Sequence, residues 1–403
     1  MRFALGSLLT VCLIVLSPTK AQPDNLSPDH KVLISVGNDT VSKIFFTFKN
    51  DVIFVKKSDK TTLLRISSKD LPHLTKLMHQ EFGRCVGYMV ENESVNPDQI
   101  LETVDDKFQS SFEAPPIRHN NLVNRTIGMV EERNIQANIE TLSNFRNRLY
   151  KSSSGVQSQQ WVGSKWKDLV KNLRDTELQY FEHSAFPQRS VILTLKGSKR
   201  PNEIVIVGGH GDSIAGWNAN ENTRAPGADD NASGISTITE VIRILGEIGY
   251  RPDRTIKFMS YAAEEVGLLG SQDIATDFKQ RGEHVIGVLQ FDMTNYTKRN
   301  REIALMTDYT DRFQNEFIKN IIKTYLPHMV TVEDRCGYAC SDHASWNRNG
   351  FPASIPFESR MNEHNHAIHS TRDTLAMSEN RAFHASQFSK IALGYLIELA
   401  ALD

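Results

Sequence analysis

Apolar and polar positions follow different patterns in the two parts of the chain. Between residues 23 and 113, runs such as 32–36 and 43–48 look like strands, and residues 71–82 have the spacing of a short amphipathic helix. After Pro116 the pattern changes to helices that alternate with short, apolar strands. That alternation favours a three-layer α/β domain.

The longer part of the chain contains most of the expected elements. Helices are predicted at residues 127–150 and 157–173, and a further helix after Gly234 carries one core-facing apolar stripe. The predicted strands are residues 190–195, 203–207, 255–259, 285–291 and 301–306.

A boundary is expected near residue 114. A polar, acidic tract at 92–106 leads to the proline pair at 115–116, which breaks any regular element. Residues 22–114 are then either an N-terminal domain that stays attached or a pro-segment that is removed, and residues 115–403 form the catalytic domain. The pattern alone leaves both interpretations open.

The first 21 residues have the features of a secretory signal peptide. Arg2 precedes an apolar run at 3–16, and small residues stand at Thr19 and Ala21. A transmembrane anchor is the alternative, but the run is shorter than the roughly 20 residues that a spanning helix needs. We therefore expect a protein that is secreted to the extracellular space without a membrane anchor.

Charge and cysteine content narrow the class of protein. The formal net charge is -2 over 403 residues, which argues against a protein built mainly to hold nucleic acid or an anionic membrane surface. Four cysteines are too few for a disulfide-framework scaffold, so the core must be hydrophobic.

Ionisable side chains gather where the predicted strands end. Three strands are each followed by a histidine or carboxylates, namely His210 with Asp212, Glu264 with Glu265, and Asp292. A fourth group, Asp229 and Asp230, stands just before the helix that follows Gly234. Because the carboxyl ends of parallel strands share one sheet edge, these groups are expected to meet there.

Each of these residues has a simpler explanation when taken alone. Asp230 could cap the following helix, Glu264 and Glu265 could be a first-turn acidic pair, and Asp292 could be a solvated strand end. Several like charges at one edge, however, repel one another unless a cation neutralises them. Histidine and carboxylate ligands together suit zinc or a similar divalent ion.

Three more histidines, His364, His366 and His369, lie close together in the sequence. They indicate either a surface loop or metal ligands, and their spacing does not decide which of them would bind a metal.

The motifs resemble those of the co-catalytic zinc aminopeptidases of the M28 peptidase family, in particular the secreted bacterial leucyl aminopeptidases of the Vibrio and Aeromonas type. The resemblance runs from about residue 115 almost to the C-terminus, and its five motifs occur in order at residues 209–213, 226–234, 263–267, 292–293 and 368–374. It implies a three-layer αβα zinc-exopeptidase fold with a mixed, mostly parallel central sheet, preceded by a small α+β pro-segment.

The resemblance also implies a role for each motif residue. Two zinc ions per catalytic domain would be held by five side chains, with Asp230 bridging them: His210, Asp230, Glu265, Asp292 and His369. Asp212 corresponds to the acid that fixes the imidazole of His210. Glu264 corresponds to the general base, and the peptide bond after Asp230 is cis in the family. On this mechanism the two ions lower the pKa of a water, whose proton Glu264 passes to the leaving amine.

Cys336 and Cys340 have two interpretations. As zinc ligands they would need further cysteines, which the chain does not supply, whereas a disulfide fits an exported protein. The family carries a disulfide at this place. The resemblance implies that Tyr338, between the two cysteines, donates a hydrogen bond to the oxyanion of the tetrahedral intermediate.

Residues that match the family's specificity pocket are mostly apolar or large, which suits a leucine-like side chain. They are Met293, Met306, Cys336, Tyr338, Cys340, Ile355, Phe357, Met361, His364 and Ile368.

The sequence therefore predicts a secreted, zymogen-like exopeptidase that removes N-terminal, preferably hydrophobic residues with two zinc ions. Its partners would be peptides with a free N-terminus and a protease that removes the pro-segment, and we expect a monomer. Carboxypeptidase, dipeptidase or glutaminyl cyclase activity on the same scaffold is the alternative. A non-enzymatic binding ectodomain is disfavoured because all five ligands and Glu264 are present.

Overall fold

The computed structural model describes residues 30–82, 84, 87–91, 95–104, 111–216, 219–298 and 302–402. The predicted signal peptide, Cys12 and Cys85 lie outside these residues. No helix in the described ranges is long and apolar enough to cross a membrane.

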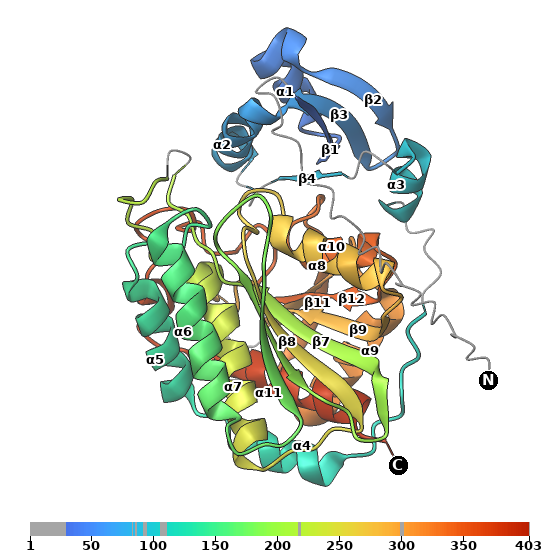
Figure 1. The fold of residues 1–403 in the computed structure, drawn as a ribbon, viewed down its shortest axis with the longest axis vertical. Helices are drawn as coiled ribbons and strands as arrows, with labels where there is room; N and C mark the ends of the chain where they lie inside the picture. The colour runs from blue at the N-terminus through green and yellow to red at the C-terminus, as the bar shows by residue number, and fades with distance from the viewer. Residues whose placement is uncertain are drawn as a thin grey trace, which may run out of the picture.

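The N-terminal unit is a small α+β arrangement that lies at one end of the larger domain (Figure 1). Its strands form a sheet in the order β2-β3-β1-β4, and each pairing is antiparallel. Its elements are β1 (Lys31–Gly37), α1 (Val41–Phe48), β2 (Ile53–Lys57), β3 (Thr61–Ser67), α2 (Leu71–Phe82), β4 (Tyr88–Val90) and α3 (Pro97–Val104).

Residues 43–48 form part of α1, so the prediction of a strand there is wrong. Ile44 and Phe48, four residues apart, are buried on one side of the helix, whereas Phe46 is 76% exposed. An alternating run this short fits a helix as well as a strand when apolar residues also fall four apart. The helix predicted at residues 71–82 is present as α2.

The larger domain is built on a six-stranded mixed sheet in the order β12-β9-β7-β8-β6-β5. The central strand β7 runs parallel to β8 and β9, and β9 runs parallel to β12, whereas β6 pairs antiparallel with β8 and β5. The mostly parallel centre is as predicted. The bounds are β5 (Thr176–Phe181), β6 (Ser190–Leu195), β7 (Arg200–His210), β8 (Arg254–Tyr261), β9 (His284–Gln290) and β12 (Ala353–Ser354).

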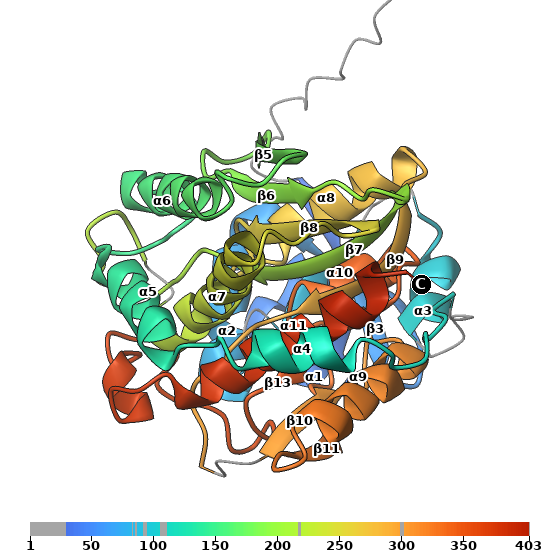
Figure 2. The ribbon, with the colours of Figure 1, turned by 90° about the horizontal axis from the view of Figure 1, so that it is seen from below.

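Helices cover both faces of this sheet, which gives the predicted three layers (Figure 2). Along β7, Val205 and Val207 pack in one core cluster with α7 and α11, while Ile204 and Ile206 pack in another with α8 and α10. The helices are α4 (Asn120–Ile127), α5 (Glu132–Asn144), α6 (Ser153–Leu169), α7 (Gly234–Glu247), α8 (Leu269–Gln280), α9 (Arg312–Tyr325), α10 (His343–Arg348) and α11 (Phe383–Ala400).

A second, three-stranded sheet extends the fold beside β12. It contains β10 (Glu302–Met306), β11 (Val330–Asp334) and β13 (Pro356–Phe357). The strands β12 and β13 are separated only by Ile355, whose carbonyl oxygen accepts a hydrogen bond from Met306 N at 3.2 Å. The segment from β12 to β13 thus links the two sheets.

The segment around residue 114 is bound to the larger domain. The ring of Phe112 packs 5.7 Å from that of Phe317 in the main core cluster. The backbone N–H groups of Arg118 and His119 donate to the buried carboxylate of Glu398 on α11, at 2.9 and 3.0 Å. Phe112, two residues before the predicted boundary, therefore already packs in the core of the larger domain.

The N-terminal unit contacts the larger domain through a buried interface. Met89 packs in one apolar cluster with residues of the larger domain, namely Leu268, Tyr309, Ala339 and Ala344. Beside this cluster Arg348 forms an ion pair with Glu91, and both side chains are more than 90% buried. The two units are therefore joined by packing as well as by the chain.

Candidate metal centre and adjoining pocket

The predicted strand-end residues meet at one edge of the central sheet. His210 is the last residue of β7, the Glu264-Glu265 pair follows β8, and Asp292 follows β9. Because β7 is parallel to both neighbours, the three strands end together. All four side chains are buried, with Asp292 the most exposed at 4%.

Asp230 lies between two histidines. Its Oδ1 is 3.0 Å from Nε2 of His210, and its Oδ2 is 3.0 Å from Nε2 of His369. Both carboxylate oxygens are buried, yet neither has a partner with hydrogen-bond geometry. Two nitrogen lone pairs and a carboxylate that converge in this way are suited to a shared metal site.

A second carboxylate faces each histidine. Asp292 Oδ1 lies 3.3 Å from His210 Nε2, and Glu265 Oε2 lies 3.0 Å from His369 Nε2. The five side chains thus fall into two sets of three that share Asp230. One ligand atom from each of His210, Asp230 and Glu265 lies within 4.8 Å of the others, so the two sets also approach each other across Asp230.

Burial and neighbouring negative charge disfavour the ionised form of the two glutamates in this cluster. Burial, together with the charge of Asp230, raises the pKa of Glu265 to about 7. Burial also raises the pKa of Glu264 well above its ordinary value, against the opposing effect of His210. A protein that keeps such groups together needs a compensating positive charge, which a divalent cation supplies. The donor set therefore fits a metal centre.

Asp212 connects the first and third motifs. Its Oδ1 accepts the N–H of Glu264 at 3.0 Å and its Oδ2 accepts the N–H of Glu265 at 3.2 Å. Oδ1 also lies 3.3 Å from Nδ1 of His210. One carboxylate thus orients the imidazole and the turn that carries both glutamates.

The loop that carries Asp230 is held by hydrogen bonds to Asp373. Its two carboxylate oxygens accept the backbone N–H groups of Asp229 and Asp230, each at 3.1 Å. The peptide bond between Asp230 and Asn231 is cis, as the resemblance implies. Asp373 lies in the last sequence motif, but the sequence analysis assigned it no role.

Sequence reasoning also missed Arg148. Its side chain is buried and donates to four backbone carbonyls. Three lie in the metal-site loops, namely Gly211 at 2.9 Å, Pro226 at 2.6 Å and Gly227 at 2.8 Å, and the fourth is Leu142 on α5 at 3.3 Å. Its burial lowers the pKa of Arg148 to about 10, against the charges of nearby carboxylates. Arg148 falls inside the helix predicted at residues 127–150, whereas α5 ends at Asn144 in the structure, so nothing in the sequence indicated this position.

The three neighbouring histidines have different surroundings. His369 reaches Asp230 and Glu265, His364 lines the adjoining pocket, and His366 is exposed. The structure thereby separates the one that faces the carboxylates from the other two.

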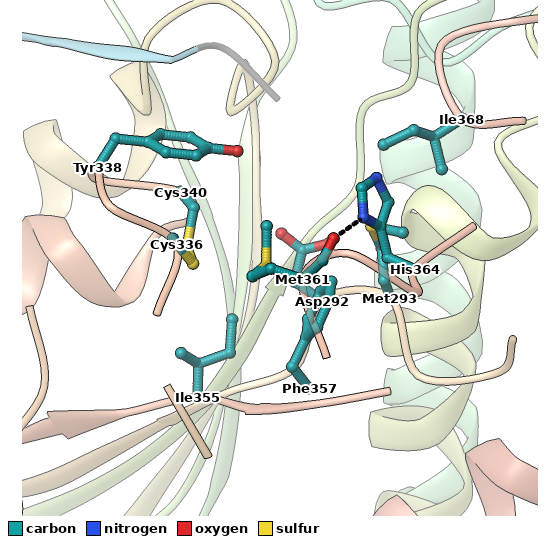
Figure 3. A pocket seen from close by; sticks show the side chains of 10 residues that line it. All are labelled: Asp292, Met293, Cys336, Tyr338, Cys340, Ile355, Phe357, Met361, His364 and Ile368. Atoms are coloured by element: carbon teal, nitrogen blue, oxygen red, sulfur yellow. Dashed lines mark hydrogen bonds between the residues drawn. A yellow bond between two sulfur atoms is a disulfide. The ribbon is translucent and has the colours of Figure 1, made fainter. Parts of the chain in front are cut away.

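An apolar pocket adjoins Asp292 (Figure 3). Nine of the ten residues predicted for the pocket line it, and the hydroxyl of Tyr338 points into it. Met306 instead packs behind the pocket, in a cluster with Met293, Ile355 and Phe357. The lining residues are Asp292, Met293, Cys336, Tyr338, Cys340, Ile355, Phe357, Met361, His364 and Ile368.

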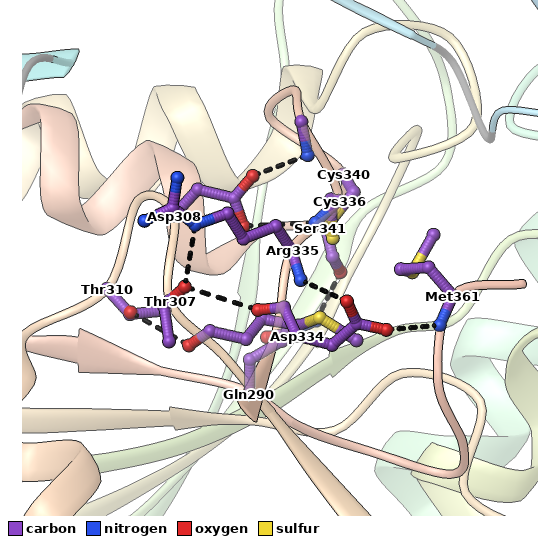
Figure 4. The surroundings of a disulfide bond; sticks show 12 residues. Gln290, Thr307, Asp308, Thr310, Asp334, Arg335, Cys336, Cys340, Ser341 and Met361 are labelled. Carbon is purple, nitrogen blue, oxygen red and sulfur yellow. Dashed lines mark hydrogen bonds between the residues drawn. A yellow bond between two sulfur atoms is a disulfide. The ribbon is translucent and has the colours of Figure 1, made fainter. Parts of the chain in front are cut away.

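Cys336 and Cys340 form a disulfide, as expected for this pair (Figure 4). The loop is anchored by Asp308, whose carboxylate accepts the N–H groups of Cys336 at 3.1 Å and Gly337 at 2.5 Å. These contacts hold Tyr338 at the rim of the pocket.

A carboxylate and histidine cluster at the carboxyl end of a mixed α/β sheet is typical of hydrolases that use divalent metal ions. Residues 190–393 match the model of peptidase family M28. The chain belongs to this family and is a hydrolase that acts on peptide bonds.

Individual relatives resemble most of the chain. Leucine aminopeptidase 1 of Arthroderma otae is 40% identical over 299 residues, which are 70% of this chain and 78% of the relative. The crystal structure of Legionella pneumophila LapA aminopeptidase is 27% identical with a TM-score of 0.79, and covers 93% of this chain and 100% of LapA. LapB from the same organism is 26% identical with a TM-score of 0.77, covering 92% and 100%. The matches to LapA and LapB are long enough to include much of the N-terminal unit.

Replacing Arg148 with methionine should destabilise the protein. The change removes the guanidinium that donates to four backbone carbonyl groups, and we expect a loss of about 3 kcal/mol in the free energy of unfolding. Urea unfolding of Arg148→Met would measure it, with Arg146→Met as a control in the same segment, because Arg146 is exposed. Equal, small losses in both variants would contradict the role of Arg148 in joining the two loops.

Proposed function

We propose that the protein is a secreted aminopeptidase that releases leucine and other hydrophobic residues from the N-terminus of peptides with two zinc ions. The observation that carries the proposal is the position of Asp230 between His210 and His369. Each histidine has a further carboxylate beside it, so each set can hold one ion, with Asp230 shared. The names of the fungal relatives support leucine as a substrate side chain.

Bound zinc would lower the pKa of a water and polarise the substrate carbonyl. His210 with Asp292 would hold one ion, His369 with Glu265 the other, and Asp230 both. Glu264 is adjacent to a ligand and its N–H is fixed by Asp212, so its carboxylate is positioned to take the proton of the water. The same carboxylate then gives that proton to the leaving amine.

The pocket supplies orientation and specificity. The apolar side chains of Met293, Ile355 and Phe357 would contact a leucine-like side chain next to the reacting carbonyl. The hydroxyl of Tyr338 would donate a hydrogen bond to the oxyanion. Because the pocket adjoins Asp292, a bound side chain lies beside the metal-binding cluster.

We also propose that the N-terminal unit is an inhibitory pro-segment, removed by another protease after export with the signal peptide. The guanidinium of Arg84 lies 4.9 Å from the ring centroid of Tyr338, and Asp39 binds Arg84 through an oxygen at 2.6 Å. Tyr338 is only 4% exposed in this arrangement. Removal of the unit would free the rim of the pocket for peptides, and the mature enzyme would act as a monomer.

Hydrolysis of leucyl-p-nitroanilide tests the reaction. After removal of the N-terminal unit, the protein should cleave this substrate but not its N-acetylated analogue, because an aminopeptidase requires a free amine. Chelation should abolish cleavage and zinc should restore it. Cleavage of neither substrate by folded, zinc-loaded protein would instead favour carboxypeptidase or cyclase activity.

The two adjacent glutamates should respond differently to substitution. Glu264→Gln should retain both zinc ions and lose about 100-fold or more in kcat, because a general base typically contributes 10²–10⁴-fold. Glu265→Ala should lower the zinc content itself. Zinc analysis beside kcat measures both effects, and equal zinc loss in the two variants would show that the roles are wrongly assigned.

Arg84→Ala should activate the unprocessed protein. A cation–π contact worth about 0.5–2 kcal/mol corresponds to roughly 2- to 30-fold in kcat/KM. Lys43→Ala is the matched control, because Lys43 is exposed on the same unit and pairs with Glu81 there. If neither Arg84→Ala nor proteolytic removal of the unit changes kcat/KM, the unit is not inhibitory.

A further inference from the structure

Asp273, His183 and Ser190 form a line of hydrogen-bonded side chains outside the metal-binding cluster. His183 lies in the connection between β5 and β6, Ser190 begins β6, and Asp273 lies on α8. The Nδ1 atom of His183 is 2.7 Å from Asp273 Oδ2, and its Nε2 atom is 2.8 Å from Ser190 Oγ. Serine, histidine and aspartate in this order can form a nucleophilic triad, so the role of Ser190 must be decided from its surroundings.

Ser190 is not placed to act as a nucleophile. The residue is 0% exposed, so no substrate carbonyl can reach its Oγ. The same oxygen accepts the backbone N–H of Ala262 at 3.0 Å. The line of hydrogen bonds therefore ends at the backbone N–H of Ala262, two residues before Glu264.

The directions of the hydrogen bonds are consistent along the whole line. Ala262 N–H can only donate, and the hydroxyl of Ser190, which accepts it, still has its own proton to donate to Nε2 of His183. In that arrangement Nδ1 of His183 donates to the carboxylate of Asp273, and every member has a defined partner.

A second contact reaches the same turn through packing. The ring of His183 stacks on Phe186, with centroids 4.7 Å apart and planes at 22°. Phe186 packs in a cluster with Ala262 and Ala263. Ala263 has a φ of 55°, a left-handed conformation that costs a non-glycine residue about 1–2 kcal/mol. Surrounding contacts must therefore hold this residue in place directly before Glu264.

We propose that His183 and Ser190, oriented by Asp273, are positioning residues for Glu264. They hold the backbone where the turn begins, while Asp212 holds the N–H groups of Glu264 and Glu265. This inference rests on the proposed function, in which Glu264 moves the proton. Asp273 is half exposed and serves to orient the imidazole.

Kinetics of two variants test the proposal. Ser190→Ala removes the acceptor of the Ala262 N–H, and His183→Phe keeps an aromatic ring against Phe186 but removes the partner of Ser190. Each should lower kcat about tenfold, since a small displacement of a catalytic group costs up to about 100-fold. KM should stay within twofold and zinc content should be unchanged. Ser190→Thr, which keeps the hydroxyl, should recover most of kcat.

Ser158→Ala is the matched control, because this buried serine donates only to Gly155 within α6. Ser158→Ala should keep kcat within twofold of the unmodified protein, even if the melting temperature of this variant falls as much as that of Ser190→Ala. Unchanged kcat in both Ser190→Ala and His183→Phe would overturn the proposal.

Amide hydrogen exchange gives a readout that does not depend on activity. A peptide covering residues 259–265 should exchange at least tenfold faster in Ser190→Ala and His183→Phe than in the unmodified protein or Ser158→Ala. Unchanged exchange would also overturn the proposal. If the unmodified protein cleaves neither leucyl substrate, the proposed function fails, and the exchange rates still decide whether this line holds the turn.

Discussion

Repulsion between buried carboxylates is the constraint on which the sheet edge depends. Hydrogen-bond donors around the edge offset this repulsion. Asp212 and Asp373 each accept two backbone N–H groups, and the guanidinium of Arg148 donates to adjacent backbone carbonyls. With these outer positions filled, the two oxygens of Asp230 face the imidazoles of His210 and His369. The protein therefore concentrates its uncompensated negative charge at the place where cations fit.

The ionisable residues at the strand ends could be predicted from the sequence, because the short apolar runs end at polar residues. His210, Glu265 and Asp292 were brought together by the register of parallel strands, which the alternation of helices and strands already favours. Arg148 was not found, since its partners are backbone carbonyls, most of them distant in sequence. His183 was not found, since its partner Asp273 lies on a distant helix. The run at 43–48 was misassigned because its apolar spacing fits both the two-residue period of a strand and the roughly 3.6-residue period of a helix.

The N-terminal unit contributes to the environment of the pocket although it lies outside the matched range of the family model. Its contact surface combines an apolar cluster with a buried ion pair, Arg348 with Glu91. Breaking a buried pair leaves an uncompensated charge. Separation of the unit from the larger domain would therefore require water to reach both groups.

Ile355 links the apolar pocket to the architecture of the sheets. It lines the pocket, and it is the single residue between β12 and β13, each of which pairs with a different sheet. A change of side chain there disturbs two hydrogen-bonded edges at once. Met361 and Ile368 line the same pocket from irregular segments. The lining of the pocket can therefore change at these two positions without altering a strand, while Ile355 is constrained as part of the scaffold.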